Sequence, residues 1–416
     1  MIPRLAQRTR FAAVALIATA VLGLTACTGG ATGTSGGDVA TLDKGLSGSI
    51  DDAVASAMEL SGSSEAVVGV WSGDDAYVRG FGDGVDGSTR IRGAQATQPV
   101  MCALLLDLVE DGTVKLGRAV EKDLERQSGI EGITYGQLCD MRSGLADYKD
   151  GFADIFVNNP TRPWPEQELI AQGLTRSPLS WPGLDVHISD TNALVLSRAI
   201  HVKTGDDMSE LLKNRVFGPA GMGSSYFPAP TSTTADDALS GLAYPSSGGK
   251  PVCDAGPAEK LEVSPSMLGG AGGTVTTVTD LKNFYARYLD GAFGGEAGKQ
   301  VTETIPVKNP ERDEEGNPTS EVDTESGDQW GFGVEKVGPL YGRSGAITGT
   351  LTAAYHDPES DFSVVVALNN SSAGAGFAKS LAFQIAALSS EAGAAPEIPW
   401  TVDYQAERLR NAAVCQ

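Results

Sequence analysis

Strand-forming segments at both ends of the chain, with helix-forming segments between them, constrain the fold most. Apolar and β-branched runs at Ala66–Ser72 and Ala76–Phe81 flank Gly73-Asp74-Asp75, a hairpin pattern. Near the C-terminus, Gly331–Val337, Thr350–Asp357 and Phe362–Leu368 have the composition of consecutive strands. We therefore expect an α/β (α+β) protein. Its antiparallel sheet, flanked by helices, is built from both termini, and a helical lobe is inserted between them.

The middle of the chain has helix patterns with identifiable starts and stops. Pro99 has a fixed φ and no N–H to lose, so it suits the first turn of a helix running to Asp111. Two other stretches, Ser246–Pro257 and the acidic Asn309–Asp328, have the composition of surface loops. The remaining expected helices are Ser49–Met58 with Ser49 as its cap, Met141–Tyr148, Asp190–Thr204, Met208–Phe217, Asp280–Leu289 and Phe377–Leu388.

The N-terminus resembles a bacterial lipoprotein signal. Three arginines precede the apolar run Phe11–Leu24, and Leu24-Thr25-Ala26-Cys27 follows at once. An ordinary secretory signal or a short membrane span are the alternatives, but the run is short for a span and the cysteine placement is specific. We expect a lipidated Cys27 that anchors the protein on the extracytoplasmic face of the cell membrane.

These features predict four regions. Residues 1–26 would be the signal peptide, and residues 27–45, rich in Gly, Thr and Ser, a flexible tether. Residues 46–390 would form the folded domain, with the helical lobe at roughly 100–270, and residues 391–416 a C-terminal tail.

Charge and motif content exclude several function classes. Asp and Glu number 53 against 31 Lys and Arg, a net charge of −22, and the signal contributes three Arg and no acid. Nucleic acid is therefore not an expected partner. Three histidines and no metal-type Cys/His spacing argue against a metal site. Gly269–Gly273 is followed by no Lys-Ser/Thr, so it is not a phosphate loop. We expect no cofactor.

The segment Ile91–Gly112 resembles the nucleophile region of the serine β-lactamase and penicillin-binding-protein-like family, which includes class C β-lactamases and DD-peptidases. In that family, a Ser-x-x-Lys pair opens a buried helix that ends in an acidic-Gly turn. Here the helix and turn are kept, but Gln95 and Gln98 stand at the two reacting positions. A glutamine amide neither attacks a carbonyl nor accepts a proton near neutral pH. The resemblance spans roughly Ile50–Leu388 and implies that family's fold.

The family's second element, Tyr-x-Asn, falls on Ile188-Ser189-Asp190. Ile188 has no proton to give, and Asp190 cannot copy the donor of an amide. A shift by one residue would place Ser189-Asp190-Thr191 on the Ser-Asp-Asn variant of the motif. That alternative supplies a serine but no nucleophile–lysine pair, so catalysis by the family route is not expected.

The third element, a strand carrying Lys or His and then x-Gly, falls on Gly342-Arg343-Ser344-Gly345. In the family its cation binds a substrate carboxylate and its backbone lines the oxyanion hole. Arg343 keeps a cation that binds carboxylates well. The alternative is an edge-strand arginine in a surface ion pair. The candidate ligand-binding residues are Gln95, Gln98, Ser189, Asp190, Arg343, Ser344 and Gly345.

Four cysteines remain after Cys27, an even number in an exported chain, and they allow three pairings. Cys102 and Cys139 lie on two predicted helices near the expected cleft, so we pair those two. The pairing of Cys253 with Cys415 follows by elimination only.

Three functional hypotheses remain. The first is a non-catalytic, membrane-anchored binding or scaffold protein of the cell envelope, whose cleft holds a carboxylate ligand such as a cell-wall peptide. The second is a serine hydrolase with a nucleophile outside the family pattern, Ser189 or Ser344. The third is a structural module that binds an unknown protein partner through Asn309–Asp328.

Overall fold

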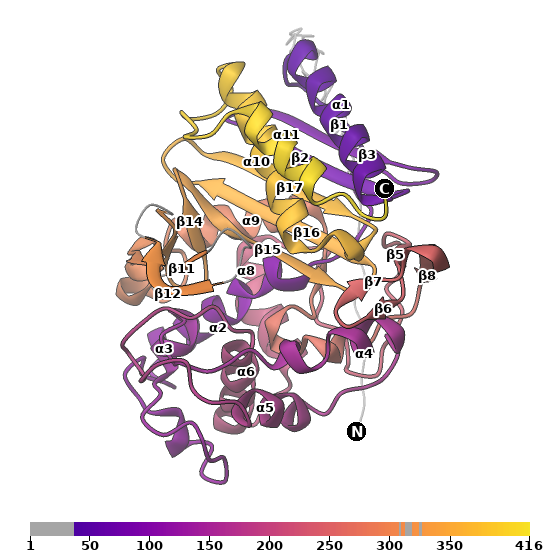
Figure 1. Ribbon diagram of the computed structural model, residues 1–416. Helices are drawn as coiled ribbons and strands as arrows, with labels where there is room; N and C mark the ends of the chain where they lie inside the picture. The colour runs from indigo at the N-terminus through magenta and orange to yellow at the C-terminus, as the bar shows by residue number, and fades with distance from the viewer. Residues whose placement is uncertain (1–36, 308, 313–317, 324–326) are drawn as a thin grey trace, which may run out of the picture. The chain divides into compact units, whose positions relative to one another are not determined.

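One antiparallel sheet positions the rest of the molecule. The computed structural model describes residues 37–307, 309–312, 318–323 and 327–416. Within them, nine strands pair in the order β1-β3-β2-β17-β16-β15-β14-β13-β10 (Figure 1). N-terminal strands thus lie beside C-terminal ones, which confirms the predicted sheet. The strands are β1 Val39–Ala40, β2 Ala66–Ser72, β3 Asp75–Phe81, β10 Ile305–Pro306, β13 Gln329–Trp330, β14 Glu335–Val337, β15 Leu340–Ile347, β16 Thr350–Asp357 and β17 Phe362–Leu368.

Helices cover both faces of this sheet. α1 (Lys44–Ser61), α10 (Ala375–Glu391) and α11 (Val402–Asn411) share one apolar core with one face (Figure 1). α9 (Val278–Leu289) and the 3-10 turn η1 (Ala94–Thr97) pack against β15–β17. Because β16 and β17 are covered on both sides, every residue of both strands is buried. The central strands are therefore apolar runs rather than alternating ones.

The first helix begins earlier than predicted, so the assignment of Ser49 as its cap was wrong. Asp43 caps α1, because its Oδ1 accepts hydrogen bonds from the backbone N–H groups of Gly45 and Leu46 at 2.8 and 3.1 Å. Glycines in the first two turns lower the local helix propensity. Burial of the apolar face against the sheet overrides that cost.

The helical lobe is inserted between η1 and the strand β9, and its elements are short apart from α2 and α6. Its elements and the remaining ones are α2 Pro99–Glu110, η2 Val120–Lys122, α3 Tyr135–Cys139, η3 Tyr148–Gly151, α4 Ala153–Asn158, α5 Glu166–Leu174, α6 Thr191–Thr204, α7 Met208–Leu212, the π-helical η4 Lys213–Phe217, α8 Gly218–Ala220, β4 Ile91–Arg92, β9 Val275–Thr276, β5 Gly241–Ala243, β8 Ala258–Lys260, β6 Ser246–Ser247, β7 Lys250–Pro251, η5 Cys253–Ala255, η6 Pro265–Met267, η7 Gly269–Ala271, η8 Gly295–Thr302 and η9 Ser371–Ala373. Within the described residues, the two-stranded sheets β4-β9, β5-β8, β6-β7 and β11-β12 are separate from the main sheet.

The predicted helix over Met141–Tyr148 does not form. Met141 has a φ of 59° and Gly144 a φ of 76°, and two left-handed residues cannot belong to one right-handed helix. The helical turn instead starts at the end of this segment, in η3, where the Asp147 side chain accepts a hydrogen bond from the N–H of Lys149 at 2.8 Å. This shift places Lys149 at the site described below.

Two segments expected to be irregular contain secondary structure. Residues 391–416, described above as a tail, include α11, which packs on α10. The described parts of Asn309–Asp328 include two paired strands, β11 (Asn309–Arg312) and β12 (Pro318–Asp323). The helix α11 is held by packing on α10, and β11 and β12 by pairing with each other, neither of which the local composition reveals.

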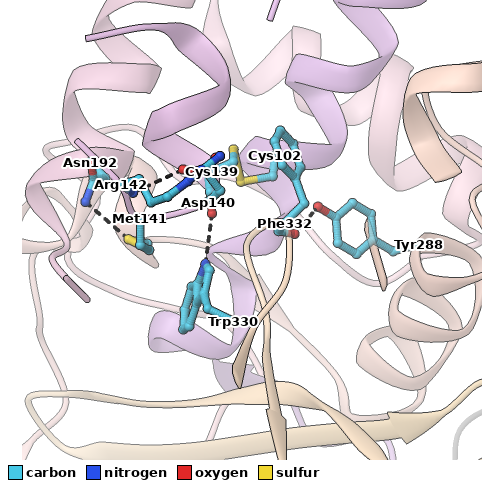
Figure 2. Close-up of a disulfide and its surroundings, with 9 residues drawn as sticks. All are labelled: Cys102, Cys139, Asp140, Met141, Arg142, Asn192, Tyr288, Trp330 and Phe332. Atoms are coloured by element: carbon cyan, nitrogen blue, oxygen red, sulfur yellow. Dashed lines mark hydrogen bonds and ion pairs between the residues drawn. A yellow bond between two sulfur atoms is a disulfide. The ribbon is translucent and has the colours of Figure 1, made fainter. Parts of the chain in front are cut away.

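Both predicted disulfides form. Cys102 on α2 bonds to Cys139 on α3, with their Cα atoms 5.9 Å apart, and Cys253 bonds to Cys415, with a Cα separation of 5.3 Å. Figure 2 shows the first of these beside the end of β13, where the indole N–H of Trp330 donates to the carbonyl oxygen of Cys139 at 3.0 Å. The disulfide thus links α2 and α3 at a point that also contacts the sheet.

The expected signal peptide and Cys27 lie outside the described residues. Among the helices that the structure describes, none is both long enough and apolar enough to cross a membrane. The described ranges also contain no group of three or more His, Cys, Asp or Glu side chains placed to hold a metal ion.

We expect buried His356 to make the fold weaker in mild acid. His356 is 3% exposed on β16, and burial lowers its pKa from 6.5 to about 4, although the nearby Asp361 carboxylate opposes the shift. Between these two values the unfolded chain binds a proton that the folded chain does not, so stability falls as the pH drops. Between pH 7 and 5, the free energy of unfolding of wild type should therefore fall by about 2 kcal/mol more than that of His356→Gln. Chemical denaturation at the two pH values measures this difference.

The matched control is His201→Gln, since His201 is exposed. It should keep the pH dependence of wild type. A His356→Gln variant with the same pH dependence as wild type would show that this histidine is not the proton-linked group.

Candidate functional site

Gln95 and Gln98 lie side by side where η1 passes into α2, and both are buried, at 4% and 1% exposure. Tight backbone packing fixes this corner. A Cβ on Gly345 would lie 2.2 Å from the backbone nitrogen of Gln95, and one on Gly272 would lie 2.4 Å from the carbonyl carbon of Ala94. Glycine at both positions therefore lets β15 and the segment after η7 approach the two glutamines.

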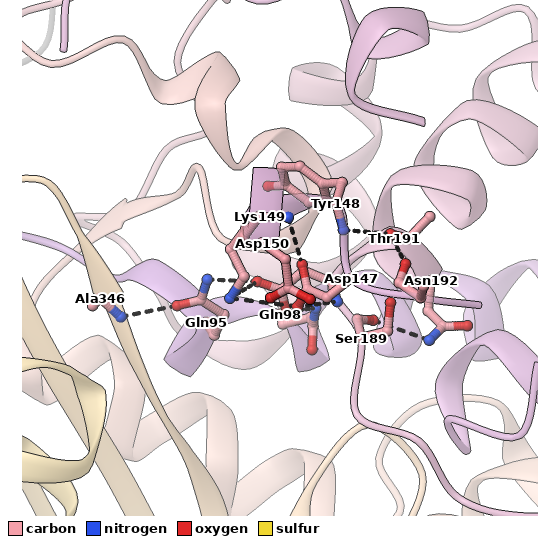
Figure 3. A network of polar contacts seen from close by, with 12 residues as sticks. Gln95, Gln98, Asp147, Tyr148, Lys149, Asp150, Ser189, Thr191, Asn192 and Ala346 are labelled. Carbon is pink, nitrogen blue, oxygen red and sulfur yellow. Dashed lines mark hydrogen bonds and ion pairs between the residues drawn. The ribbon is translucent and has the colours of Figure 1, made fainter. Parts of the chain in front are cut away.

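Asp190 is the centre of the site. Its carboxylate accepts a hydrogen bond from the Nε2 atom of Gln95 at 2.6 Å and one from that of Gln98 at 3.0 Å. It also pairs with Nζ of Lys149 at 2.7 Å and Nη2 of Arg343 at 3.4 Å. Figure 3 shows side chains of this network, from η1, η3 and the start of α6. At 1% exposure, Asp190 is a buried anion with a partner on every side.

Two cations decide the protonation state of Asp190. Burial alone would raise the pKa of Asp190, but Lys149 and Arg343 hold it below its usual range. The same attraction raises the pKa of Lys149 despite the opposing effect of its burial. Asp147 differs, since burial and the nearby Asp190 charge raise its pKa. Its Oδ2 accepts a hydrogen bond from the backbone N–H of Asp190 at 3.2 Å. The network therefore favours an ionised Asp190.

Gln95 also accepts a hydrogen bond from a backbone N–H group of the sheet. Its Oε1 accepts a hydrogen bond from the N–H of Ala346 on β15 at 2.9 Å (Figure 3). The resemblance places the oxyanion hole at the backbone of this strand. Because the amide nitrogen of Gln95 is held by Asp190 and its oxygen by Ala346, the side chain is fixed at both ends.

The structure brings together the four charged or amide candidates, Gln95, Gln98, Asp190 and Arg343, with Gly345 against Gln95. Arg343 is 6% exposed, and its guanidinium carbon lies 4.8 Å from the ring centroid of Trp330. It is not a surface arginine, so the edge-strand alternative is wrong.

The serine candidates are not placed as nucleophiles. Successive side chains of a strand point to opposite faces, so Ser344 points away from the face that carries Arg343. Ser189 is fully buried, and among the described residues its hydroxyl has no hydrogen-bond partner. Ile188 is 49% exposed, so its side chain is largely outside the site.

Lys149 is the site residue that the sequence did not identify. It directly follows the segment Met141–Tyr148, for which the sequence predicts a helix. A helix there would not form the turn that brings Lys149 to Asp190. One signal was available. The sequence places an acid, Asp190, where the family has an amide, next to two neutral amides. Such an acid can be buried in its charged form only if a cation lies beside it. With Lys149 present, the site has both a lysine and an arginine on one carboxylate.

Chemically, the arrangement pairs charges and places amides, not a hydroxyl or a thiol, at the two reacting positions of the family. A family acylation site needs a hydroxyl or thiol within hydrogen-bond reach of a base. Here both reacting positions carry amides, and the strongest acceptor, Asp190, is kept ionised and surrounded by cations. The geometry therefore supports charge pairing and hydrogen bonding.

A family model described as Beta-lactamase matches residues 50–388 of the chain. Solved structures agree on the fold. A D-stereospecific amidohydrolase from Streptomyces is 22% identical, with a TM-score of 0.66 over 79% of this chain and 94% of that one.

Two further structures are similar. A D-amino acid amidase from Ochrobactrum anthropi SV3, complexed with D-phenylalanine, is 20% identical, with a TM-score of 0.61 over 88% of this chain and 99% of that one. An octameric penicillin-binding protein homologue from Pyrococcus abyssi is 20% identical, with a TM-score of 0.66 over 84% and 78%. At these identities the similarity shows the fold alone.

Proposed function

This chain belongs to the beta-lactamase family, and we propose that it is a non-catalytic member that acts by binding, as a lipid-anchored ligand-binding or scaffold protein of the cell envelope. One observation carries the proposal, the Asp190 network at the acylation site. Both reacting positions are amides that bind Asp190, and the amide oxygen of Gln95 takes the N–H of Ala346. A substrate carbonyl would find neither a nucleophile nor that free donor.

An active hydrolase with another nucleophile has less support. Ser189 is the serine nearest to Asp190 in sequence, but it is fully buried. Asp190 is a weak base because Lys149 and Arg343 lower its pKa. A general base should instead have a pKa near the working pH.

We expect no hydrolysis of family-type substrates. The assay would use D-phenylalanine amide, a chromogenic cephalosporin and p-nitrophenyl acetate with the full chain, alongside Asp190→Asn. Wild type and variant should both match the rate in buffer, because no group is placed to attack the carbonyl. A wild-type rate above buffer that disappears in Asp190→Asn would contradict the proposal.

The ligand we propose for this site is a carboxylate, such as that of a cell-wall peptide. Arg343 Nη1 is a buried donor that makes no hydrogen bond within the part of the chain that the structure describes. A ligand carboxylate that replaced Asp190 at Arg343 would accept hydrogen bonds from this guanidinium. If Arg343→Ala binds every cell-wall peptide as wild type does, by calorimetry, the carboxylate proposal is wrong.

The lipid anchor is supported by the sequence around Cys27. Its test is metabolic labelling with a fatty acid during expression in a bacterium. Wild type should incorporate label and fractionate with membranes, and Cys27→Ser should do neither. Equal labelling of the two proteins would show that Cys27 is not the lipidated residue.

A further inference from the structure

A cavity lies in the helical lobe, apart from the Asp190 site. Its volume is about 300 Å³, at the lower end of the range for small-molecule pockets. None of the residues that bind Asp190 lines it. Its apolar walls come from four segments of the lobe and include Trp164, Leu194, Phe227 and Pro265.

The glycine run that the Asp190 site uses only in part forms one side of this cavity. Gly269 and Gly270 line it, and a Cβ on Gly270 would lie 2.6 Å from the Cβ of Ser197 on α6. Gly269 has a φ of 48° and faces Leu194. Glycine therefore allows η7 to lie directly on α6.

One edge of the cavity carries a carboxyl group that lacks a close counter-charge. Glu166 is the first residue of α5, and Ser197 and His201 lie one turn apart on α6. Burial raises the pKa of Glu166, and the hydroxyl of Ser197 and the charges of Arg198 and His201 do not cancel that effect. No cation lies within 4.0 Å of this carboxyl among the residues that the structure describes.

The other titratable groups of the lining do not supply the missing charge. Asp207 is acidic, and the Nδ1 atom of His201 is within 2.9 Å of the carbonyl oxygen of Asp206. The cavity therefore combines apolar walls with an acidic edge. A ligand that brings a positive charge would give the half-buried Glu166 carboxyl the counter-charge it lacks, whereas an anion would add a second negative charge beside it.

We propose that this cavity binds a small organic cation, a primary ammonium group on a compact aromatic or branched aliphatic body. The ammonium would lie at Glu166 and the body between Trp164, Leu194 and Phe227. Aromatic walls suit such a ligand, because ring faces attract cations as well as covering apolar surface. The proposal stands whether or not the Asp190 site is catalytic.

Calorimetry with three probes of nearly equal size tests the charge requirement. The probes are 2-phenylethylamine, 2-phenylethanol and 3-phenylpropionate, titrated into the full chain at pH 7 and low salt. The amine should bind at least about tenfold more tightly than the carboxylate, with the alcohol between them. Equal binding of all three, or no binding of the amine, would overturn the proposal.

Three variants locate the binding. Glu166→Gln preserves the shape of the side chain. It should weaken the binding of the amine about tenfold and leave the binding of the alcohol unchanged. Glu168→Gln is the matched control, since Glu168 lies on the same helix but pairs with Arg162 outside the cavity lining, at 2.7 Å. Arg343→Ala should also bind the amine as wild type does. An amine that binds Glu166→Gln and wild type equally would be bound elsewhere, which contradicts the proposal.

Discussion

Replacing Asp190 with alanine should lower the free energy of unfolding by about 3 kcal/mol, because it leaves the buried cation Arg343 without its anion. Arg343 is 6% exposed and would lose its carboxylate partner altogether. Gln95 and Gln98 would each lose the acceptor of their Nε2 atom. The measurement is chemical denaturation at pH 7, followed by circular dichroism.

The matched control for this variant is Glu296→Ala. Glu296 forms an ion pair of similar length with Lys299, at 2.7 Å, but its side chain is 90% exposed. Exposed pairs contribute little, so this variant should change the unfolding free energy by less than about 1 kcal/mol. Equal effects of the two substitutions would mean that the Asp190 network does not stabilise the fold.

Removing the Cys253–Cys415 disulfide should cost still more. The bond closes a loop of 162 residues, and the chain-entropy argument gives a loss of about 5 kcal/mol for the Cys253→Ser, Cys415→Ser pair. The bond also holds the C-terminus, where the N–H of Val414 donates to the carbonyl oxygen of Leu60 at 2.9 Å. Thermal unfolding of the double variant should therefore begin well below that of wild type.

The Cys102→Ser, Cys139→Ser pair provides the comparison. Its disulfide spans 37 residues, so the same argument predicts about 4 kcal/mol. The two costs are close because closure entropy grows slowly with loop length. A Cys253/Cys415 variant as stable as wild type would show that this bond constrains the unfolded chain little.

Much of the fold was predictable because its signals are local or come from the family resemblance. The hairpin of β2 and β3, the strands β16 and β17 and the helix α2 follow from periodicity and turn residues. The start of α1 was missed because its glycines weaken the local pattern while the core decides the outcome. The helix α11 was missed in a stretch that local composition marks as a tail.

The candidate site was predictable only in part. Gln95, Gln98, Asp190 and Arg343 were placed together by the family register, and the structure shows them in contact. Lys149 was not placed at the site. Its position depends on the left-handed residues Met141 and Gly144, which follow the end of α3 and delay the next helical turn to η3. No spacing rule links Lys149 to a carboxylate 41 positions later in the chain.

The cavity of the helical lobe could not be predicted from the sequence, because no local pattern indicates which distant segments line it. Trp164 is 3% exposed, lies against Phe152 and Phe156, and lines this cavity. Its neighbours come from segments distant in the sequence, which only the folded chain brings together.

We propose that the acylation site is chemically inert, because amides and a paired carboxylate fill it. The most direct test is the intact mass of the full chain after incubation with a penicillin and, separately, a labelled fluorophosphonate. A Gln95→Ser, Gln98→Lys variant is run in parallel to ask whether the reacting pair alone restores acylation. We predict an unchanged mass for wild type with both reagents. A stable adduct on wild type would contradict the account, and the peptide that carries it would identify the nucleophile.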